Sequence, residues 1–373
     1  MIIRNLASKK ILQLILSAVF ILLSTWQSYA QTSLLKPGFE KSEYVELMQM
    51  HARLYDTTKN KLPFPVHFKY AYRSPVVGMD NRWDLWINEK STIAVINLRG
   101  TTVNPVSWLQ NFYAAMVPAR GELRLSNQFT FKYHLADNPR AAVHIGWLIG
   151  VAYLSADILP KIDSCYKKGI RNFIVMGHSQ GGALSYLMTS HLYQLQKDNI
   201  IPKDVRFKTY SSAAPKAGNV YYAYEYEHLI RGGWGVNIIN GADWVPQSPF
   251  SVQTLGDFNN TNPFRDIDAV VKKQKFFTRI AMRHAYRQLK KPSEKAQRNY
   301  EKYLGGFVSK IVKKTLPEFV PPAYVHTSDY VRIGPTITLL GDDNYYKLFP
   351  DSQKDVFVHH LLGPYLYLID QYK

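Results

Sequence analysis

The residues best suited to chemistry form a Gly-x-Ser-x-Gly pentapeptide, Gly-His-Ser-Gln-Gly at 177–181. Such a pentapeptide alone arises often by chance. Here an apolar run at 172–176 precedes it and a helical pattern at 183–196 follows it, which predicts a tight strand-to-helix turn. That turn strains its central residue, and the flanking glycines let nearby backbone pass without a Cβ clash. We therefore expect Ser179 to be a nucleophile; the alternative is a glycine-rich turn with an idle serine.

A serine hydroxyl needs a general base, and the base needs a carboxylate to orient it. In α/β-hydrolases these residues follow one another in the order Ser, acid, His. Asp243 comes directly after an apolar run at 236–240, so it would lie in a loop at the carboxyl end of a strand. We predict that Asp243 is the acid. A turn-forming role for Asp243 and an acid at Asp257 are the alternatives, although no apolar strand leads to Asp257.

Four histidines follow the predicted acid. His284 lies in a basic segment, and His326 follows two prolines without a clear element. His359 and His360 come just before an apolar stretch at 361–366, which is typical of a final helix. Because adjacent residues point in different directions, we expect only one of these two histidines to face the site.

The developing oxyanion of an acyl-transfer reaction needs two hydrogen-bond donors, and losing one costs on the order of 100-fold or more in rate. We expect one donor from the backbone N–H of Gln180. The other is expected from a loop after an earlier apolar run at 93–96, where Gly100 allows a tight turn and Thr101 offers an N–H and a hydroxyl. No metal or organic cofactor is expected, because the Ser–His pair generates the nucleophile itself.

Strand-like and helix-like segments alternate through the middle of the chain. We expect strands at 93–96, 172–176, 205–211 and 235–240, and helices at 143–168 and 183–196. This alternation predicts a mostly parallel central sheet with helices on both faces. The fold class is therefore α/β, of the α/β-hydrolase type.

Residues 1–30 have the composition of a secretory signal peptide, with a basic start, an apolar stretch and small residues before a cleavage site after Ala30. An uncleaved membrane anchor is the alternative, although the apolar stretch is short for a spanning helix of about 20 residues. We expect residues 31–373 to form the mature hydrolase domain, exported to the periplasm or the extracellular medium.

The formal net charge of the 373 residues is +18 at pH 7, and much of it lies in one segment. Residues 271–314 contain fourteen Lys or Arg and two acids, Glu294 and Glu301. We assign a basic, helix-rich insertion or cap to about 257–330, before the C-terminal histidine. It is either a solvated helix face or a contact surface for an anionic membrane or lipid interface. Binding of nucleic acid is a weaker hypothesis, because the sequence has no zinc-finger spacing and no RNP-type aromatic motif.

Five landmarks, in this order, resemble the class 3 lipase family, to which fungal triacylglycerol lipases belong. They are an oxyanion loop at 99–101, a His-x-Gly-aromatic helix start at 143–147, the pentapeptide with the following glycine at 177–182, a Pro-basic-x-Gly-Asn turn at 214–219 and an acid loop at 240–249.

The resemblance implies Ser179 as nucleophile, Asp243 as acid and Thr101 with Gln180 in the oxyanion hole. It favours His360 over His359, because family members often have Leu and Tyr after the catalytic histidine. The sequence departs from the family in three respects. Trp108 lies about one residue further from the oxyanion loop than expected, and the fungal disulfides are absent. The segment between Asp243 and the histidine is also long. A segment at 108–117 is similar to the family's lid, or is an ordinary packed helix.

We predict a secreted, lipase-like serine carboxylester hydrolase that cleaves acylglycerols or related lipids through an acyl-enzyme on Ser179. The alternatives on the same fold are an esterase for feruloyl or polysaccharide esters and a phospholipase. A catalytically silent, lipase-like binding protein is a further alternative. The intact Ser, Asp and His set argues against it.

Overall fold

The computed structural model describes residues 35–55, 62–264 and 271–372. The predicted signal peptide at 1–30 lies outside these residues, so it stays a prediction. The chain divides into two units, Met1–Lys36 and Pro37–Lys373, and the second contains every element described below.

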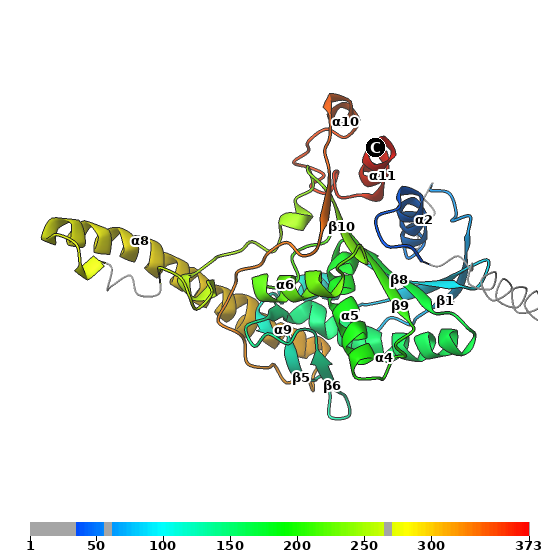
Figure 1. The fold of residues 1–373 in the computed structure, drawn as a ribbon, viewed down its shortest axis with the longest axis horizontal. Coiled ribbons are helices and arrows are strands. Elements are labelled where there is room, and N and C mark those ends of the chain that lie inside the picture. The colour runs from blue at the N-terminus through cyan, green and yellow to red at the C-terminus, as the bar shows by residue number, and fades with distance from the viewer. Residues whose placement is uncertain (1–34, 56–61, 265–270, 373) are drawn as a thin grey trace, which may run out of the picture. The chain divides into compact units, whose positions relative to one another are not determined.

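A seven-stranded sheet lies at the centre of this unit, in the order β1-β2-β3-β8-β9-β10-β11 (Figure 1). The first three strands pair in antiparallel fashion, and the pairs from β3 to β11 are parallel. The strands are β1 (Phe68–Arg73), β2 (Trp83–Asn88), β3 (Ile93–Leu98), β8 (Asn172–His178), β9 (Arg206–Ser212), β10 (Gly235–Asn240) and β11 (Thr336–Leu339). The predicted α/β class with a mostly parallel sheet is therefore confirmed.

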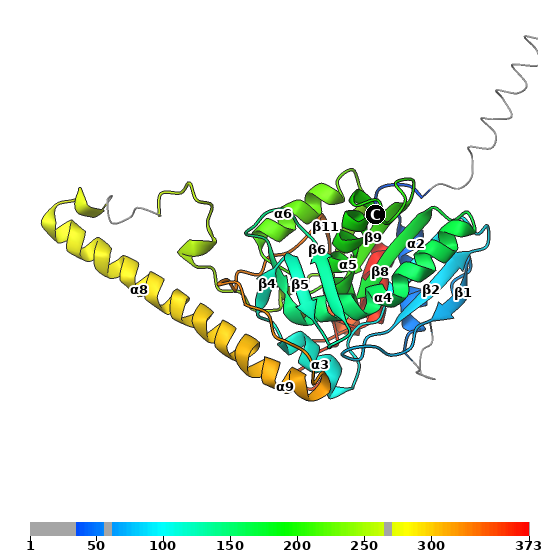
Figure 2. The ribbon, with the colours of Figure 1, turned by 90° about the horizontal axis from the view of Figure 1, so that it is seen from below.

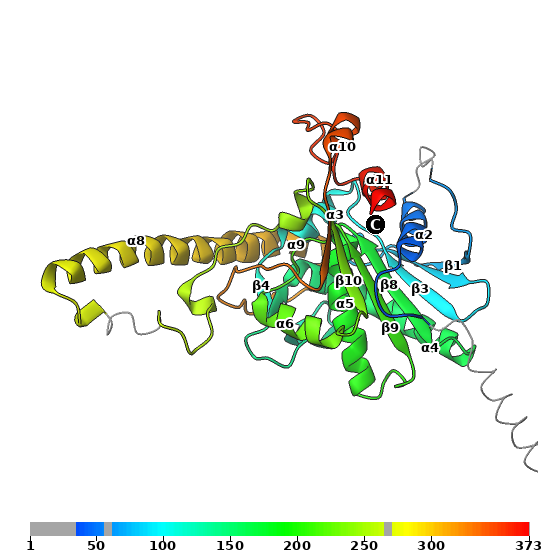
Figure 3. The same ribbon diagram turned by 45° about the horizontal axis from the view of Figure 1, so that its top comes forward.

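Helices cover both faces of the sheet. α2 (Lys41–Ala52) packs against β3 and β8, and α11 (Leu362–Gln371) packs against β10 and β11. α5 (Gln180–Lys197) packs against β8 and β9, with α4 (Ile145–Lys167) beside it. Figures 1 and 3 show α2 and α11 on one face and α4 and α5 on the other. Every residue of β8 is buried, as expected for a central parallel strand covered on both faces.

The predicted strands and helices agree with the structure to within a few residues at each end. The helix expected at 143–168 begins at Ile145, because Ala142–His144 forms β7 and pairs with β4 (Met116–Pro118). The side chain of His144 then caps α4 by accepting a hydrogen bond from the backbone N–H of Trp147. A cap of this kind satisfies one of the unpaired N–H groups of the first turn.

The segment considered as a lid divides into two elements. α3 (Pro105–Phe112) is followed by β4, in which Met116 and Val117 are buried. These two residues therefore belong to the packed core and not to a cover over the site. The remaining elements are β5 (Arg120–Arg124), β6 (Thr130–His134), α6 (Val220–Leu229), η1 (Val245–Gln247), η2 (Leu255–Asp257) and α10 (Asp343–Leu348).

The basic segment forms three consecutive helices between β10 and β11. They are α8 (Phe276–Tyr300), the π-helical η3 (Glu301–Phe307) and α9 (Val308–Thr315). Figure 2 shows α8 leading away from the sheet in line with α9.

Within the described part of the chain, α4 alone has the length and mean hydropathy of a membrane-spanning helix. Its most apolar window is 67% buried inside the fold. Burial of this extent is what a core helix of a packed domain shows.

Candidate active site

Ser179 lies at a sharp turn between β8 and α5. Its backbone has φ 62° and ψ −129°, a conformation that a residue with a side chain adopts only under strain of order 1–3 kcal/mol. The turn is fixed to the next strand, because the N–H of Ser179 donates to the carbonyl of Ser212 at 3.0 Å. The strained backbone directs the serine side chain into a cavity at the carboxyl edge of the sheet.

The glycines of the pentapeptide make this turn sterically feasible. A Cβ on Gly177 would overlap the carbonyl of Gly181, and one on Gly181 would overlap the carbonyl of Leu98. A Cβ on Gly182 would lie 2.7 Å from the carbonyl of Ser212. Each glycine therefore permits a backbone-to-backbone approach that any other residue would block.

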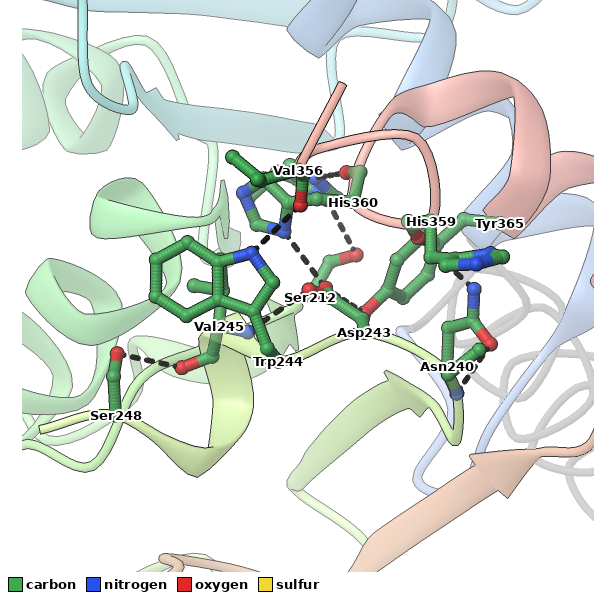
Figure 4. Close-up of polar contacts among 12 residues, drawn as sticks. Ser212, Asn240, Asp243, Trp244, Val245, Ser248, Val356, His359, His360 and Tyr365 are labelled. Carbon is green, nitrogen blue, oxygen red and sulfur yellow. Dashed lines mark hydrogen bonds and ion pairs between the residues drawn. The ribbon is translucent and has the colours of Figure 1, made fainter. Parts of the chain in front are cut away.

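Asp243 and His360 are brought together from distant parts of the sequence (Figure 4). The imidazole Nδ1 of His360 lies 2.7 Å from Oδ2 of Asp243. The same carboxylate oxygen accepts a hydrogen bond from the hydroxyl of Tyr365 at 2.8 Å, and Oδ1 accepts one from the N–H of Val245 at 2.9 Å. Since the carboxylate accepts these hydrogen bonds, His360 must carry its proton on Nδ1, which leaves Nε2 to accept a proton.

The neighbouring histidine, His359, points away from this pair (Figure 4). Its Nδ1 lies 2.8 Å from the hydroxyl of Tyr345, and its Nε2 lies 2.9 Å from Asp351. Its backbone carbonyl accepts a hydrogen bond from the amide of Asn240. His359 therefore fixes the loop that carries His360.

The rival candidates from the sequence lie elsewhere. Asp257 caps η2 through Thr254 and accepts a hydrogen bond from Thr327. His284 is on the exposed part of α8, and His326 pairs with Glu301. None of the three lines the cavity that contains Ser179.

Thr101 and Gln180 line the same cavity as Ser179. Gln180 is the first residue of α5, so its N–H has no partner within the helix and is available to a ligand. The hydroxyl of Thr101 accepts a hydrogen bond from Asn111 at 2.9 Å, which leaves the hydroxyl proton to be donated. Each residue therefore has a hydrogen-bond donor available in the cavity that Ser179 also lines, and the oxyanion role of both remains a prediction.

Asn111 is a residue that sequence reasoning missed. Its side-chain oxygen accepts hydrogen bonds from Trp147 and from the amide of Gln180, both at 2.9 Å, which fixes the orientation of its own amide. That orientation directs the Asn111 NH₂ group at Thr101. No sequence signal marks Asn111, because its partners come from three separate elements.

The cavity has a volume of about 1210 Å³. Ser179 and His360 line it, but most of its wall is apolar and includes Trp108, Phe112 and Leu304. Two aromatic contacts border the His360 loop: the Phe357 ring lies 6.0 Å from Trp108 and 5.5 Å from Trp244. In the described part of the chain, no group of three or more His, Cys, Asp or Glu side chains is placed to hold a metal.

A buried chain of hydrogen bonds lies behind the cavity. His178 Nε2 is 2.8 Å from the backbone carbonyl of His360, so this nitrogen must be the donor. Burial keeps the pKa of His178 well below 6.5 and the ring neutral, so its Nδ1 accepts from Ser212 at 2.9 Å. The hydroxyl of Ser212 lies 2.6 Å from that of Tyr44 on α2. His178 thereby ties the strand before the nucleophile to the loop that holds the candidate base.

Four buried histidines have lowered pKa values, from which we predict that the folded state loses stability in acid. Burial lowers the pKa of His51 and His191 to about 4, that of His144 to about 3, and that of His178 well below 6.5. An unfolded histidine takes up its proton near pH 6.5. The unfolded state therefore binds more protons as the pH falls below about 6.5. Each such histidine then removes about 1.4 kcal/mol of stability per pH unit until its folded pKa is reached.

We expect the thermal unfolding midpoint to change little from pH 7.5 to about pH 6.5 and then to fall steadily to pH 4.5. The variant His191→Leu removes one of these groups without touching the cavity, so its midpoint should fall less steeply. His228→Gln, which removes an exposed imidazole, is the matched control and should keep the wild-type slope. Equal slopes in all three proteins would show that the buried histidines do not set the acid limit.

The geometry and the fold together define an α/β-hydrolase with a Ser, His and Asp constellation. Residues 95–253 match a family model described as Lipase (class 3), and these residues include the five motifs identified in the sequence. The resemblance drawn from the five motifs is thus confirmed. Among the curated proteins, none matches the sequence of this chain.

Several solved structures are similar to the chain at low sequence identity. The lipase in the Rhizomucor miehei lipase–propeptide complex is 17% identical, with a TM-score of 0.42, over 57% of this chain and 65% of that one. The lipase of Rhizopus microsporus var. chinensis is 19% identical, with a TM-score of 0.41, over 56% and 69%. The chain therefore spans slightly less than two thirds of the Rhizomucor protein.

Proposed function

We propose that this protein is a serine carboxylester hydrolase that cleaves acyl esters of lipids through an acyl-enzyme on Ser179. One observation carries the proposal. A serine in a strained elbow conformation and a histidine 2.7 Å from a buried carboxylate line the same cavity. This combination of nucleophile, base and orienting acid is what serine-dependent acyl transfer requires.

In the first half of the reaction, Ser179 Oγ attacks the ester carbonyl carbon, and His360 Nε2 takes the hydroxyl proton. Asp243 stabilises the imidazolium that forms. The carbonyl oxygen becomes an oxyanion, which accepts hydrogen bonds from the Gln180 N–H and from Thr101. The C–O bond to the alcohol then breaks, and His360 returns its proton to the leaving alcohol.

In the second half, a water molecule attacks the acyl-enzyme while His360 accepts one of its protons. The second tetrahedral intermediate uses the same two oxyanion donors. It collapses by breaking the bond to Ser179 Oγ, which regains its proton from His360. The products are a carboxylic acid and an alcohol.

The cavity supports an acyl chain as the group that is bound. Its volume of about 1210 Å³ exceeds the roughly 300–1,000 Å³ that holds a drug-sized ligand. Aromatic and aliphatic side chains dominate its wall, so it favours methylene groups over the hydroxyl-rich surface of a polysaccharide. This composition favours lipid esters over feruloyl or polysaccharide esters.

We also propose that the protein acts outside the cytoplasm, in the periplasm or the medium. The support is the composition of residues 1–30. N-terminal sequencing of the protein recovered from outside the cytoplasm tests it, with Gln31 expected as the first residue.

The proposed substrate class predicts a change in chain-length preference on filling the cavity. Leu304→Trp should lower kcat/KM for p-nitrophenyl palmitate roughly tenfold or more, because hydrophobic pockets discriminate by about that factor for small changes in fit. It should leave p-nitrophenyl butyrate, whose acyl chain fills far less of the cavity, nearly unchanged. Steady-state kinetics on both esters makes the measurement.

Leu340→Trp is the matched control, since Leu340 is exposed and follows β11. Its chain-length profile should equal that of the wild type. A wild-type protein that hydrolyses butyrate but not palmitate would instead indicate a short-chain esterase. A folded protein with no activity on any ester would favour the binding-protein alternative.

A further inference from the structure

Helix α8 carries a charge excess that the proposed hydrolysis does not use. Between Phe276 and Tyr300 it has one acid, Glu294, and only Gln297 and Tyr300 are buried. Its seven basic residues are Arg279, Arg283, Arg287, Lys290, Lys291, Lys295 and Arg298. Helices that are only solvated usually mix both signs of charge, so this excess points to an anionic partner.

Four of these basic residues form one stripe along the helix. Arg287, Lys291, Lys295 and Arg298 follow one another at spacings of four, four and three, which places them on the same side. All four are exposed. Glu294 lies 3.8 Å from Lys290, so the helix's single carboxylate is paired with a base outside the stripe.

The far end of α8 is apolar and exposed. Phe276, Phe277 and Ile280 have 64%, 83% and 53% of their surface exposed. Three large apolar side chains at a helix end are unfavourable in water and mark a contact surface. An apolar end beside a basic stripe matches a lipid surface, in which headgroups bind the bases and the apolar side chains enter the acyl layer.

The near end of α8 joins the wall of the active-site cavity. Tyr300, its last residue, and Leu304, one turn into η3, both line the cavity. The helical rod is held there by Gly305, which packs closely against Ala115, and by the buried Val308 of α9. Figures 2 and 3 show α8 running outward from this point.

We propose that α8 is a docking arm for anionic lipid surfaces. The Arg287–Arg298 stripe binds the negatively charged headgroups, and Phe276, Phe277 and Ile280 insert into the acyl layer just below them. Because the arm is rooted in the cavity wall, docking keeps the cavity next to the lipid from which an acyl ester enters. This inference rests on the proposed function for its purpose, but lipid binding itself is measured without hydrolysis. The apolar end and the link to an apolar cavity favour lipid over nucleic acid.

The test is co-sedimentation of the full chain with vesicles of phosphatidylcholine, alone or mixed with phosphatidylglycerol. The wild type should bind the mixed vesicles far more tightly, and added salt should weaken that binding. The variant R287Q/K291Q/K295Q/R298Q should lose roughly 100-fold or more in vesicle affinity, because each base near an anionic surface contributes several-fold. Phe277→Ser should weaken binding in high salt, where the apolar contribution dominates.

The matched control removes four exposed lysines from the α/β body: K90Q/K168Q/K203Q/K347Q. It has the same net charge as the α8 variant and should bind vesicles like the wild type. Residues 1–30 are the same in every variant, so any contribution from that apolar segment cancels. Hydrolysis of soluble p-nitrophenyl butyrate should be equal in all of them, which separates failed docking from failed catalysis.

Two outcomes would overturn the docking arm. One is equal vesicle binding by the α8 variant and the body variant, which would mean that net charge alone drives binding. The other is tight, salt-dependent binding of a DNA duplex that the α8 variant loses, with no preference for anionic vesicles. A wild type that does not hydrolyse butyrate would instead contradict the proposed function. Vesicle binding would still test the docking arm in that case.

Discussion

Replacing Ser179 with alanine should reduce kcat for p-nitrophenyl ester hydrolysis by on the order of 10⁴-fold or more. Only the hydroxyl group is removed, so the cavity and the hydrogen bond between His360 and Asp243 should persist. The variant cannot form an acyl-enzyme. The oxyanion donors can still bind the ester carbonyl, but no serine nucleophile is present to attack it. The measurement is kcat on butyrate and octanoate esters, with an active-site titration of the wild type as reference.

The control for this variant is its stability. Alanine has a Cβ like serine, so the strained backbone at φ 62° is retained and the unfolding midpoint should change by only a few degrees. Residual activity within tenfold of wild type, in a folded protein, would mean that another group is the nucleophile. A variant that unfolds at low temperature would need repeating with Ser179→Gly, which relaxes the strain.

Replacing Asp243 with asparagine should lower kcat roughly 10³- to 10⁴-fold. The carboxylate accepts hydrogen bonds on both oxygens: from His360 and Tyr365 on one, and from the Val245 N–H on the other. An amide can satisfy only one side. With its NH₂ toward His360 it forces the wrong tautomer of the imidazole, and with its NH₂ toward Val245 it opposes an N–H donor. Kinetics over pH 6 to 9 measures the loss.

Tyr365→Phe separates this effect from a general disturbance of the site. It removes one of the two donors to the same carboxylate oxygen and leaves the negative charge and the bond from His360 in place. We expect a loss below about tenfold, because a single neutral hydrogen bond contributes roughly 0.5–1.5 kcal/mol. If Asp243→Asn lost no more activity than Tyr365→Phe, the carboxylate would not be the group that orients His360.

Sequence reasoning predicted the parts of the candidate site that depend on local chemistry. The pentapeptide predicted Ser179 because a strand-to-helix turn with glycines on both sides has few other solutions. Asp243 followed from the end of an apolar strand, β10. The choice of His360 over His359 came from resemblance alone, because two adjacent loop histidines are equivalent until Tyr345 and Asp351 engage one of them.

The parts that sequence reasoning missed depend on contacts between distant segments. Asn111 has no local signature, since its role comes from Trp147, Gln180 and Thr101. Strands β1 and β2 were missed because they lie in a polar, aromatic stretch where β2 is buried and β1 is mostly exposed at the sheet edge. Strand β11 follows the long helical segment. Its four residues are too few for their alternation of polar and apolar side chains to predict a strand.

The hydrogen-bonded chain from Tyr44 through Ser212 and His178 to the His360 carbonyl links four elements. Helix α2, strands β8 and β9 and the C-terminal loop share it, and its inner members are buried. Local opening of any one of them would leave buried polar groups of the others unpaired, so we expect the four to exchange their amide hydrogens as one cooperative unit. We therefore expect the loop that carries His360 to open together with these elements. Inactivation on heating would accompany the unfolding of α2 rather than precede it.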